Sequence, residues 1–353
     1  MNILFVGYID AAGIGNTYVN AINKYTDHEA RLVAVLETRG FPSDLVIYRD
    51  LFGGFNFKSP EYFGGEFKKL VDWCDVCIFS MAVSPGSGRE DHKHDDTDYR
   101  LDEDFVKDIL KKQGKKCFSF FFGSVALRHN YDFYIDICKK NGFQGAITCQ
   151  PDIYFEVKKR NYPISYIPIM VDLANPCYRN SIFDFVKKEQ FGPDKINIAH
   201  SPTNKVIKNT NEFLKVISDI NSKNEKQCYS PVIIDNHGFY DSIMLKKMCH
   251  VGFDQMQYDW SYYCLSSVEN MALGLINIVA MNDKHLALVS EDIGGKLPWR
   301  ICNNSEELQS TMESIYDTRL THLYDEMAWN YEFARTNWND EKHIPKLIKI
   351  LES

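Results

Sequence analysis

The sequence predicts an α/β fold of two Rossmann-like domains that face a cleft. Short apolar runs alternate with helical patterns along the chain, which is typical of parallel sheets covered by helices. The alternation begins twice, at residue 2 and again at residue 195. The 353 residues are enough for two domains that each bury a core. We expect the first domain over 1–175, the second over 176–335, and a C-terminal helix over 336–353 that packs toward the first domain.

The first series opens with the apolar run at 2–8, which is typical of a strand buried on both faces. A turn, DAAGIGNT, and a helix follow it. Further strands are expected at 31–37, 44–48, 76–83, 117–122, 145–149 and 164–169, and helices at 60–73, 103–113 and 131–141. The last two helices end at Gly114 and Gly142, as helices often do.

The second series follows an expected helix at 181–190. Strands are expected at 195–200, 231–235, 252–256 and 275–281, and helices at 209–222, 240–250, 266–273, 305–316 and 320–350. In such open sheets, ligands bind at the carboxyl ends of the strands. Functional residues are therefore expected in the loops that follow the strands.

Composition excludes several classes of protein. The chain has 40 Lys plus Arg and 48 Asp plus Glu, so its formal charge is −8. This net negative charge disfavours general binding to nucleic acid or to anionic lipid. No apolar run reaches the length of a membrane span, and the N-terminus lacks the basic start of a signal peptide. The ten cysteines include one CxxC, Cys74 and Cys77, with no second pair for a zinc ribbon. We expect reduced core cysteines and a cytoplasmic protein.

The first candidate motif is Gly13, Gly15 and Asn16, between the first strand and its helix. Glycines there allow a phosphate to approach the backbone at a helix N-terminus. The motif lacks the third glycine of a dinucleotide site, and Glu37 matches a ribose-binding acid in spacing alone. A nucleotide site and a ligand-free tight turn both remain open.

The second and third motifs follow strands of the second series. His200 ends a strand, and Lys205 and Lys208 stand before the next helix, where two cations suit a diphosphate or form a solvated pair. Ser266 or Ser267 is expected to cap a helix whose N–H groups face a phosphate. Glu269 is placed to accept hydrogen bonds from a ribose diol, or to stabilise the helix start without any ligand.

Four segments together resemble glycosyltransferase family four, a family with the GT-B fold. They are FFFGSVALR, SYIPIMVD, HSPTNKVIKNTNEFL and FDQMQYDWSYYCLSSVENMALGLINIVA, in the family's order over about residues 118–281. The resemblance implies an acceptor-binding first domain and a second domain that binds a nucleotide-sugar donor, UDP-linked. It implies a retaining, metal-independent transfer to an acceptor hydroxyl with no further cofactor.

The resemblance also implies roles for particular residues. Glu269 falls on the ribose-binding glutamate, and Lys208 on the phosphate-binding lysine with Lys205 near its basic partner. Leu265 and Ser266 fall on the backbone donors to the diphosphate, and His200, Ser267 and the turn at Gly13, Gly15 and Asn16 complete the expected donor site. Lysines and helix N–H groups stabilise a departing diphosphate, and Lys205, Lys208 and Arg128 are the expected catalytic residues.

The sequence departs from the family pattern near this site. Ser261 stands where the family often has a glutamate, Tyr262 and Tyr263 replace a glycine-rich loop, and Asn209 stands where glycine is usual. The resemblance therefore does not fix the sugar of the donor.

Two further candidates lie in the first domain. Arg128 follows an expected strand end and is placed to contact acceptor or phosphate, or to cap the surface. The charged stretch 89–104 holds His92, His94 and the formal DxD at Asp96–Asp98; a solvated or acceptor-facing loop, an acid/base histidine and a metal site are its three interpretations, and we expect no metal.

Several functions remain open. The leading hypothesis is a hexosyl- or pentosyltransferase acting on a glycan, a lipid carrier or, as in phage enzymes of this architecture, a hydroxymethylated DNA base. The alternatives are a GT-B UDP-sugar epimerase and a noncatalytic nucleotide-sugar-binding protein.

Overall fold

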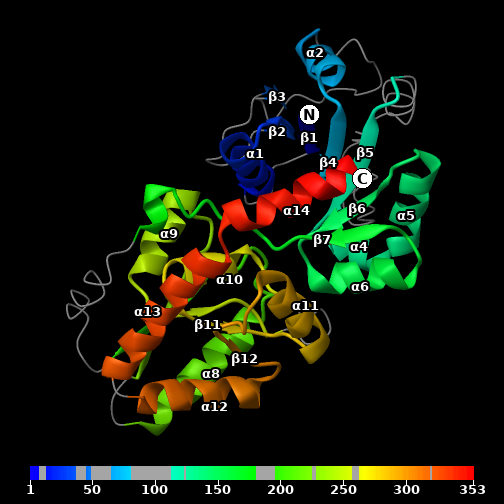
Figure 1. Cartoon of the computed structure of the whole chain (residues 1–353). Coiled ribbons are helices and arrows are strands. Elements are labelled where there is room, and N and C mark those ends of the chain that lie inside the picture. The colour runs from blue at the N-terminus through cyan, green and yellow to red at the C-terminus, as the bar shows by residue number, and fades with distance from the viewer. Residues whose placement is uncertain are drawn as a thin grey trace. The chain divides into compact units, whose positions relative to one another are not determined.

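The computed structural model of the chain is shown in Figure 1. It describes residues 1–7, 13–36, 45–48, 65–80, 113–122, 125–179, 195–224, 228–256, 262–318 and 320–353. The chain divides into two compact units: unit 1 is Met1–Pro168 with His343–Ser353, and unit 2 is Ile169–Lys342. Each unit has its own sheet and its own core.

Unit 1 contains a parallel sheet of seven strands in the order β3-β2-β1-β4-β5-β6-β7. The strands are β1 (Asn2–Gly7), β2 (Glu29–Leu36), β3 (Leu45–Tyr48), β4 (Val76–Ser80), β5 (Lys116–Phe121), β6 (Gly145–Thr148) and β7 (Ile164–Tyr166). The helices among them are α1 (Ile14–Tyr25), α2 (Gly65–Trp73), α4 (Val125–His129), α5 (Tyr131–Lys140) and α6 (Pro151–Lys159). The direction of winding reverses between β1 and β4, the usual place for a ligand in such a sheet.

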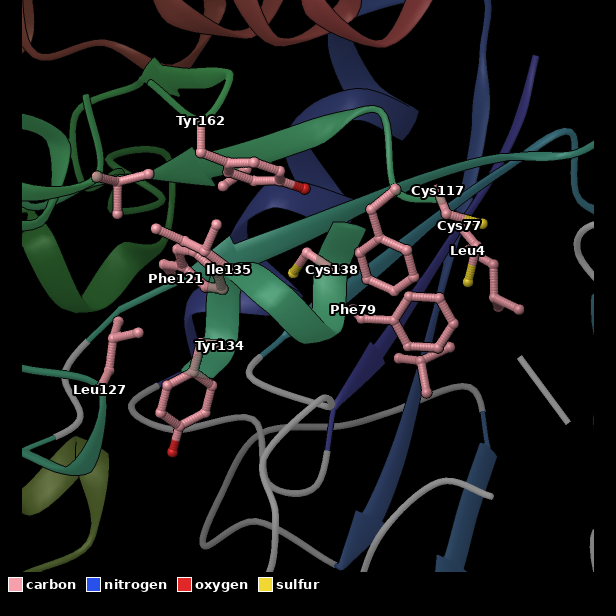
Figure 2. Packing of buried hydrophobic residues seen from close by; sticks show 14 of the residues in the cluster. Leu4, Cys77, Phe79, Cys117, Phe121, Leu127, Tyr134, Ile135, Cys138 and Tyr162 are labelled. Carbon is pink, nitrogen blue, oxygen red and sulfur yellow. The ribbon is translucent and has the colours of Figure 1, made fainter. Parts of the chain in front are cut away.

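Side chains from both faces of this sheet are buried. On one face Phe79 stacks on Phe143 with ring centroids 5.4 Å apart. Cys138 of α5 belongs to the same buried cluster, and Figure 2 labels Phe79 and Cys138 within it. On the other face Phe120 meets Tyr18 of α1 with centroids 5.3 Å apart. Neighbouring residues of a strand point to opposite faces, so a sheet covered on both sides needs the continuous apolar runs that the sequence shows.

Unit 2 contains a parallel sheet of five strands in the order β12-β11-β10-β8-β9. The strands are β8 (Ile196–His200), β9 (Tyr229–Ile233), β10 (Val251–Phe253), β11 (Ile276–Val279) and β12 (Trp299–Ile301). The helices are η4 (Pro176–Tyr178), α8 (Thr210–Lys223), α9 (Phe239–Lys247), α10 (Leu265–Ala272), α11 (Asp283–Ile293), α12 (Ser305–Asp317) and α13 (Leu320–Asn337). Here the winding reverses between β8 and β10.

A close approach of helix to strand fixes α10 in unit 2. A Cβ atom added to Gly252 of β10 would lie 2.2 Å from Nδ2 of Asn270 on α10. Only glycine therefore lets the helix pack this close to the strand. The same Asn270 amide donates to Oδ1 of Asn277 in β11, at 3.1 Å.

The C-terminal segment forms two helices where the sequence analysis expected one over 320–350. The chain breaks after α13 because Trp338 is buried against Tyr263 and Trp299, and its indole N–H donates to the carbonyl of Ile169. Asn339 then accepts a hydrogen bond from the Glu341 backbone at 2.8 Å, which starts α14 (Asp340–Glu352). From His343 onward the chain belongs to unit 1.

The predicted fold class is confirmed: two Rossmann-like domains with parallel sheets, and a C-terminal helix that returns to the first. The helices α4, α6 and α11 and the strand β12 were not expected from the sequence, and α4 lies in a stretch that was expected to be a loop. The stretch 89–104 and the helix expected at 181–190 lie outside the described residues. The helix expected at 103–113 also lies outside them, except for its last residue, Gln113. Among the helices that the structure describes, none is long and apolar enough to cross a membrane.

Candidate functional site

The strongest candidate site lies in unit 2, where β8 and β10 end side by side. His200 at the end of β8 pairs in register with Phe253 at the end of β10. The loop 201–209 follows β8, and the segment from Asp254 follows β10. The carboxyl ends of these two strands thus bring together residues that lie about fifty positions apart in the sequence, at the point where the winding reverses.

Lys208 from the first loop forms a buried ion pair with Asp254. Its Nζ atom donates to Oδ1 of Asp254 at 2.6 Å, and the two side chains are 7% and 1% exposed. Burial acts to lower the pKa of Lys208, but the charge and hydrogen bond of Asp254, together with Cys264 and Tyr262, raise that pKa above its ordinary value. Burial acts to raise the pKa of Asp254, but Lys208 lowers it below the usual range. Both side chains are therefore charged at neutral pH.

Asp254 also organises the start of α10. Its second oxygen, Oδ2, accepts hydrogen bonds from the Cys264 backbone N–H, at 2.8 Å, and from the Ser267 hydroxyl. Within the described residues, no hydrogen bond engages the backbone N–H groups of Leu265 and Ser266. The ammonium of Lys208 and the positive end of a helix dipole thus meet at one place, which is the pattern of an anion site.

A second buried ion pair contacts the same helix start. Nζ of Lys246, on α9, donates to Oε2 of Glu269 at 2.5 Å and to the Ser266 hydroxyl at 3.0 Å. The side chains of Lys246 and Glu269 are 1% and 10% exposed. The adjacent residues Ser266 and Ser267 therefore link one ion pair each to the first turn of α10.

His200 joins the two strand ends to α8. Since a carbonyl can only accept, Nδ1 of His200 donates to the Phe253 carbonyl at 3.1 Å, and Nε2 accepts from the Thr210 hydroxyl at 2.8 Å. Burial lowers the pKa of His200 to about 4, and its ring packs against both Phe213 and Phe253, which stack on each other. This neutral imidazole therefore links the ends of β8 and β10 to the start of α8. Its part in donor binding stays a prediction.

The two lysines of the loop 201–209 have different surroundings. Lys205 is 55% exposed, with its Nζ 2.7 Å from Oδ2 of Asp235, whereas Lys208 is buried. The loop ends at Asn209, whose φ of 53° is left-handed. Asparagine tolerates that conformation better than most residues, and glycine adopts it freely. Both residue types therefore suit this position.

The remaining predicted residues lie in unit 1. Gly13 has a φ of 70° directly before α1, and its carbonyl accepts from the Thr17 hydroxyl at 2.9 Å. Gly15 and Asn16 lie in the first turn of α1, which follows β1. The left-handed turn accounts for Gly13, and the structure places these residues in a different unit from Lys208 and Glu269. Glu37 lies outside the described residues.

Arg128 is engaged inside unit 1. Its Nε donates to Oδ2 of Asp152 at 2.6 Å and its side chain is 3% exposed. It also donates to the Gln150 side chain at 3.1 Å. Arg128 thus joins α4 to the start of α6, at the carboxyl ends of β5 and β6. Across the described ranges, no three His, Cys, Asp or Glu side chains are grouped to hold a metal ion.

Comparisons with known proteins agree with this architecture. No protein-family model and no curated protein sequence matches the chain. HepE of Anabaena, solved in complex with UDP, is 10% identical, with both chains covered to 100% and a TM-score of 0.64. Sucrose-phosphate synthase of Thermosynechococcus elongatus is 9% identical over 100% of this chain and 98% of its own, with a TM-score of 0.65. The UDP-GlcNAc 2-epimerase of Neisseria meningitidis, bound to UDP-GlcNAc, is 10% identical over 100% of both chains, with a TM-score of 0.52.

The fold is GT-B. At these identities the likeness shows the fold and leaves the activity to be argued from the site.

Two residues of this candidate site were not expected from the sequence. Asp254 stands inside the segment that carries the resemblance, so its position after a strand was a usable signal. Lys246 precedes Lys247 near the end of an expected helix, where lysines are usually solvated. Its burial depends on α9 packing beside α10, which no local pattern shows.

Proposed function

We propose that this chain is a glycosyltransferase that moves a sugar from a UDP-sugar to an acceptor hydroxyl. The observation that carries the proposal is the buried Lys208, held by Asp254 beside the N-terminus of α10. A departing nucleoside diphosphate develops negative charge on its phosphate oxygens. Preorganised cations and N–H groups stabilise such charge most strongly in a site that excludes water.

Residues around this point fit the parts of a donor nucleotide. The backbone N–H groups of Leu265 and Ser266 and the ammonium of Lys208 would bind the diphosphate. Glu269 would accept hydrogen bonds from the ribose, and Lys205, on the exposed part of the loop, would approach the outer phosphate. These groups supply positive charge from the chain itself, which supports a metal-independent reaction.

Finer features rest on the resemblance and are part of the proposal. They are membership of glycosyltransferase family four, a retaining outcome, transfer of a hexose or pentose, and acceptor binding by unit 1. A part for the Gly13 turn in donor binding, and contact of Arg128 with acceptor or phosphate, are proposals as well. The acceptor is a glycan, a lipid carrier or a modified DNA base. We also propose a cytoplasmic location, because all ten cysteines are free and thiols persist in reducing compartments.

The experiment is a panel of UDP-, GDP- and ADP-sugars incubated with the protein, with product nucleotide and sugar isomers followed by chromatography. A transferase slowly releases free UDP without acceptor and much faster with the correct acceptor. Rapid formation of a donor isomer would instead show a UDP-sugar epimerase, the second candidate, which the likeness to the Neisseria enzyme favours. If the protein neither bound nor turned over any of these donors, both proposals would be overturned.

The matched variants for this assay are K208M and K215M. Lys215 is exposed on α8 of the same unit, so its loss changes the overall charge equally without touching the site. K208M should lower turnover at least about a hundredfold, in line with the loss of one oxyanion-stabilising group. K215M should retain wild-type turnover.

A further inference from the structure

Lys246 is unusual because its ammonium is buried on the inner side of α9. The residue is 1% exposed, whereas its neighbour Lys247 is half-buried and donates to the carbonyl of Arg179. An ammonium removed from water is costly unless its hydrogen bonds and charge are satisfied. The partners of Lys246 are therefore specific features of the site.

Those partners lie on a single turn of α10. Lys246 Nζ donates to Oε2 of Glu269 and to the hydroxyl of Ser266, which stand three residues apart on one helix face. The ammonium thus holds one oxygen of the Glu269 carboxylate and fixes its rotamer. No hydrogen bond from the described residues reaches the other oxygen, Oε1.

Other titratable groups near Glu269 come from η4. The charge of Glu269 contributes to raising the pKa of Cys177, which burial and its neighbours raise to about 11. It also contributes to raising the pKa of Tyr178, for which burial is the main cause. Both groups are neutral at physiological pH, and among the described residues the ion pair of this carboxylate is with Lys246.

We propose that Lys246 is a positioning residue that orients Glu269 toward the ribose hydroxyls and so sets a preference for ribonucleotides over 2′-deoxyribonucleotides. This inference rests on the proposed function, because it assumes that a donor nucleotide binds beside α10. With one oxygen held by Lys246, the carboxylate presents its free oxygen in a fixed direction to a hydroxyl of the ribose. A site built to pair with a hydroxyl rejects the analogue that lacks it.

The test is calorimetric binding of UDP and 2′-deoxyUDP, with the ADP and GDP pairs measured in parallel. Wild-type protein should bind the ribonucleotide at least about tenfold more tightly, as expected for a hydrogen bond to a charged group. K246M should reduce the ratio of ribonucleotide to 2′-deoxyribonucleotide affinity to near one, and E269Q should do the same. K247M, the control from the same helix, should keep the wild-type ratio.

The ratio separates positioning from general stability, because a merely structural role would weaken binding of both nucleotides equally. If K246M does not fold, K246Q replaces it. The shorter, uncharged glutamine side chain cannot hold the Glu269 carboxylate as the ammonium does, so the ratio of UDP to 2′-deoxyUDP affinity should also fall. An unchanged affinity ratio in either folded variant, or equal binding of both nucleotides by wild-type protein, would overturn the role proposed for Lys246. The proposed function would not be affected by either result. If wild-type protein binds no nucleoside diphosphate, the proposed function falls and this inference falls with it.

Discussion

Nζ of Lys208 lies 2.6 Å from Oδ1 of Asp254, and neither side chain is more than 7% exposed. The same carboxylate holds the first turn of α10 through Cys264 and Ser267. One aspartate therefore sets the relative positions of the cation and the helix N-terminus. The anion site that we propose depends on this arrangement more than on any single donor to the ligand.

Removing the charge of Asp254 tests this organising role. D254N leaves the ammonium of Lys208 buried without its counterion, which should lower the free energy of unfolding by about 3–5 kcal/mol. D235N breaks the more exposed pair with Lys205 and should cost less than about 1 kcal/mol. Urea unfolding at neutral pH measures both variants, and equal small losses would contradict the buried pairing.

The pH dependence of stability tests His200. Its pKa is lowered to about 4 in the folded chain, so between about pH 4 and 6.5 the unfolded chain binds more protons. The stability from a neutral His200 is thus present above about pH 6.5 and is lost as the pH falls toward 4. Between pH 7 and pH 5, wild-type protein should lose about 2 kcal/mol more than H200Q. H322Q, at an exposed position, should show the same change of unfolding free energy with pH as wild-type protein. If H200Q also showed the wild-type change, His200 would not be the titrating group.

The packing of α10 on β10 predicts an intolerant glycine. G252A would place a Cβ 2.2 Å from the Asn270 side chain, and such overpacking should cost about 1–3 kcal/mol. In G295A the nearest atom lies at an ordinary 3.6 Å, on Phe333, so that variant should stay within about 1 kcal/mol of wild type. Thermal unfolding compares the two, and a tolerated G252A would mean that α10 lies farther from the strand than described.

The left-handed backbone at Asn209 predicts different effects for alanine and glycine. N209A should lower the free energy of unfolding by about 1 kcal/mol, because alanine is strained at a φ of 53°. N209G relieves that strain and should stay close to wild type. If alanine and glycine gave the same stability, the loop 201–209 would not have the conformation described.

Much of the fold was predictable because it follows from local pattern. Continuous apolar runs such as 2–8 predicted buried parallel strands, and the two βα series predicted two Rossmann-like domains. The three-residue strand β12 and the short apolar face of α11 gave too little signal, since Val289 and Ile293 are the buried residues of that helix. The break at Trp338 depends on tertiary contacts with Tyr263 and Trp299, which periodicity does not show.

The site was predictable in part, for a related reason. Lys208, Ser266, Ser267 and Glu269 stand at a loop and a helix start, where sequence pattern is informative, and the structure brings them to one place. The burial of Lys246 arises from helices packing across the chain. A lysine in a polar helix end looks solvated in the sequence, whatever it contacts in the fold.

Calorimetric titration of UDP tests the central claim most directly, that unit 2 binds a nucleoside diphosphate through Lys208 and the start of α10. The variant to compare is K208M/D254N, which removes both charges of the buried pair and so avoids leaving one of them unpaired. The account predicts measurable binding by wild-type protein and at least about tenfold weaker binding by the folded double variant. Equal affinity in the two proteins, or no binding of UDP, GDP or ADP by wild-type protein, would contradict it.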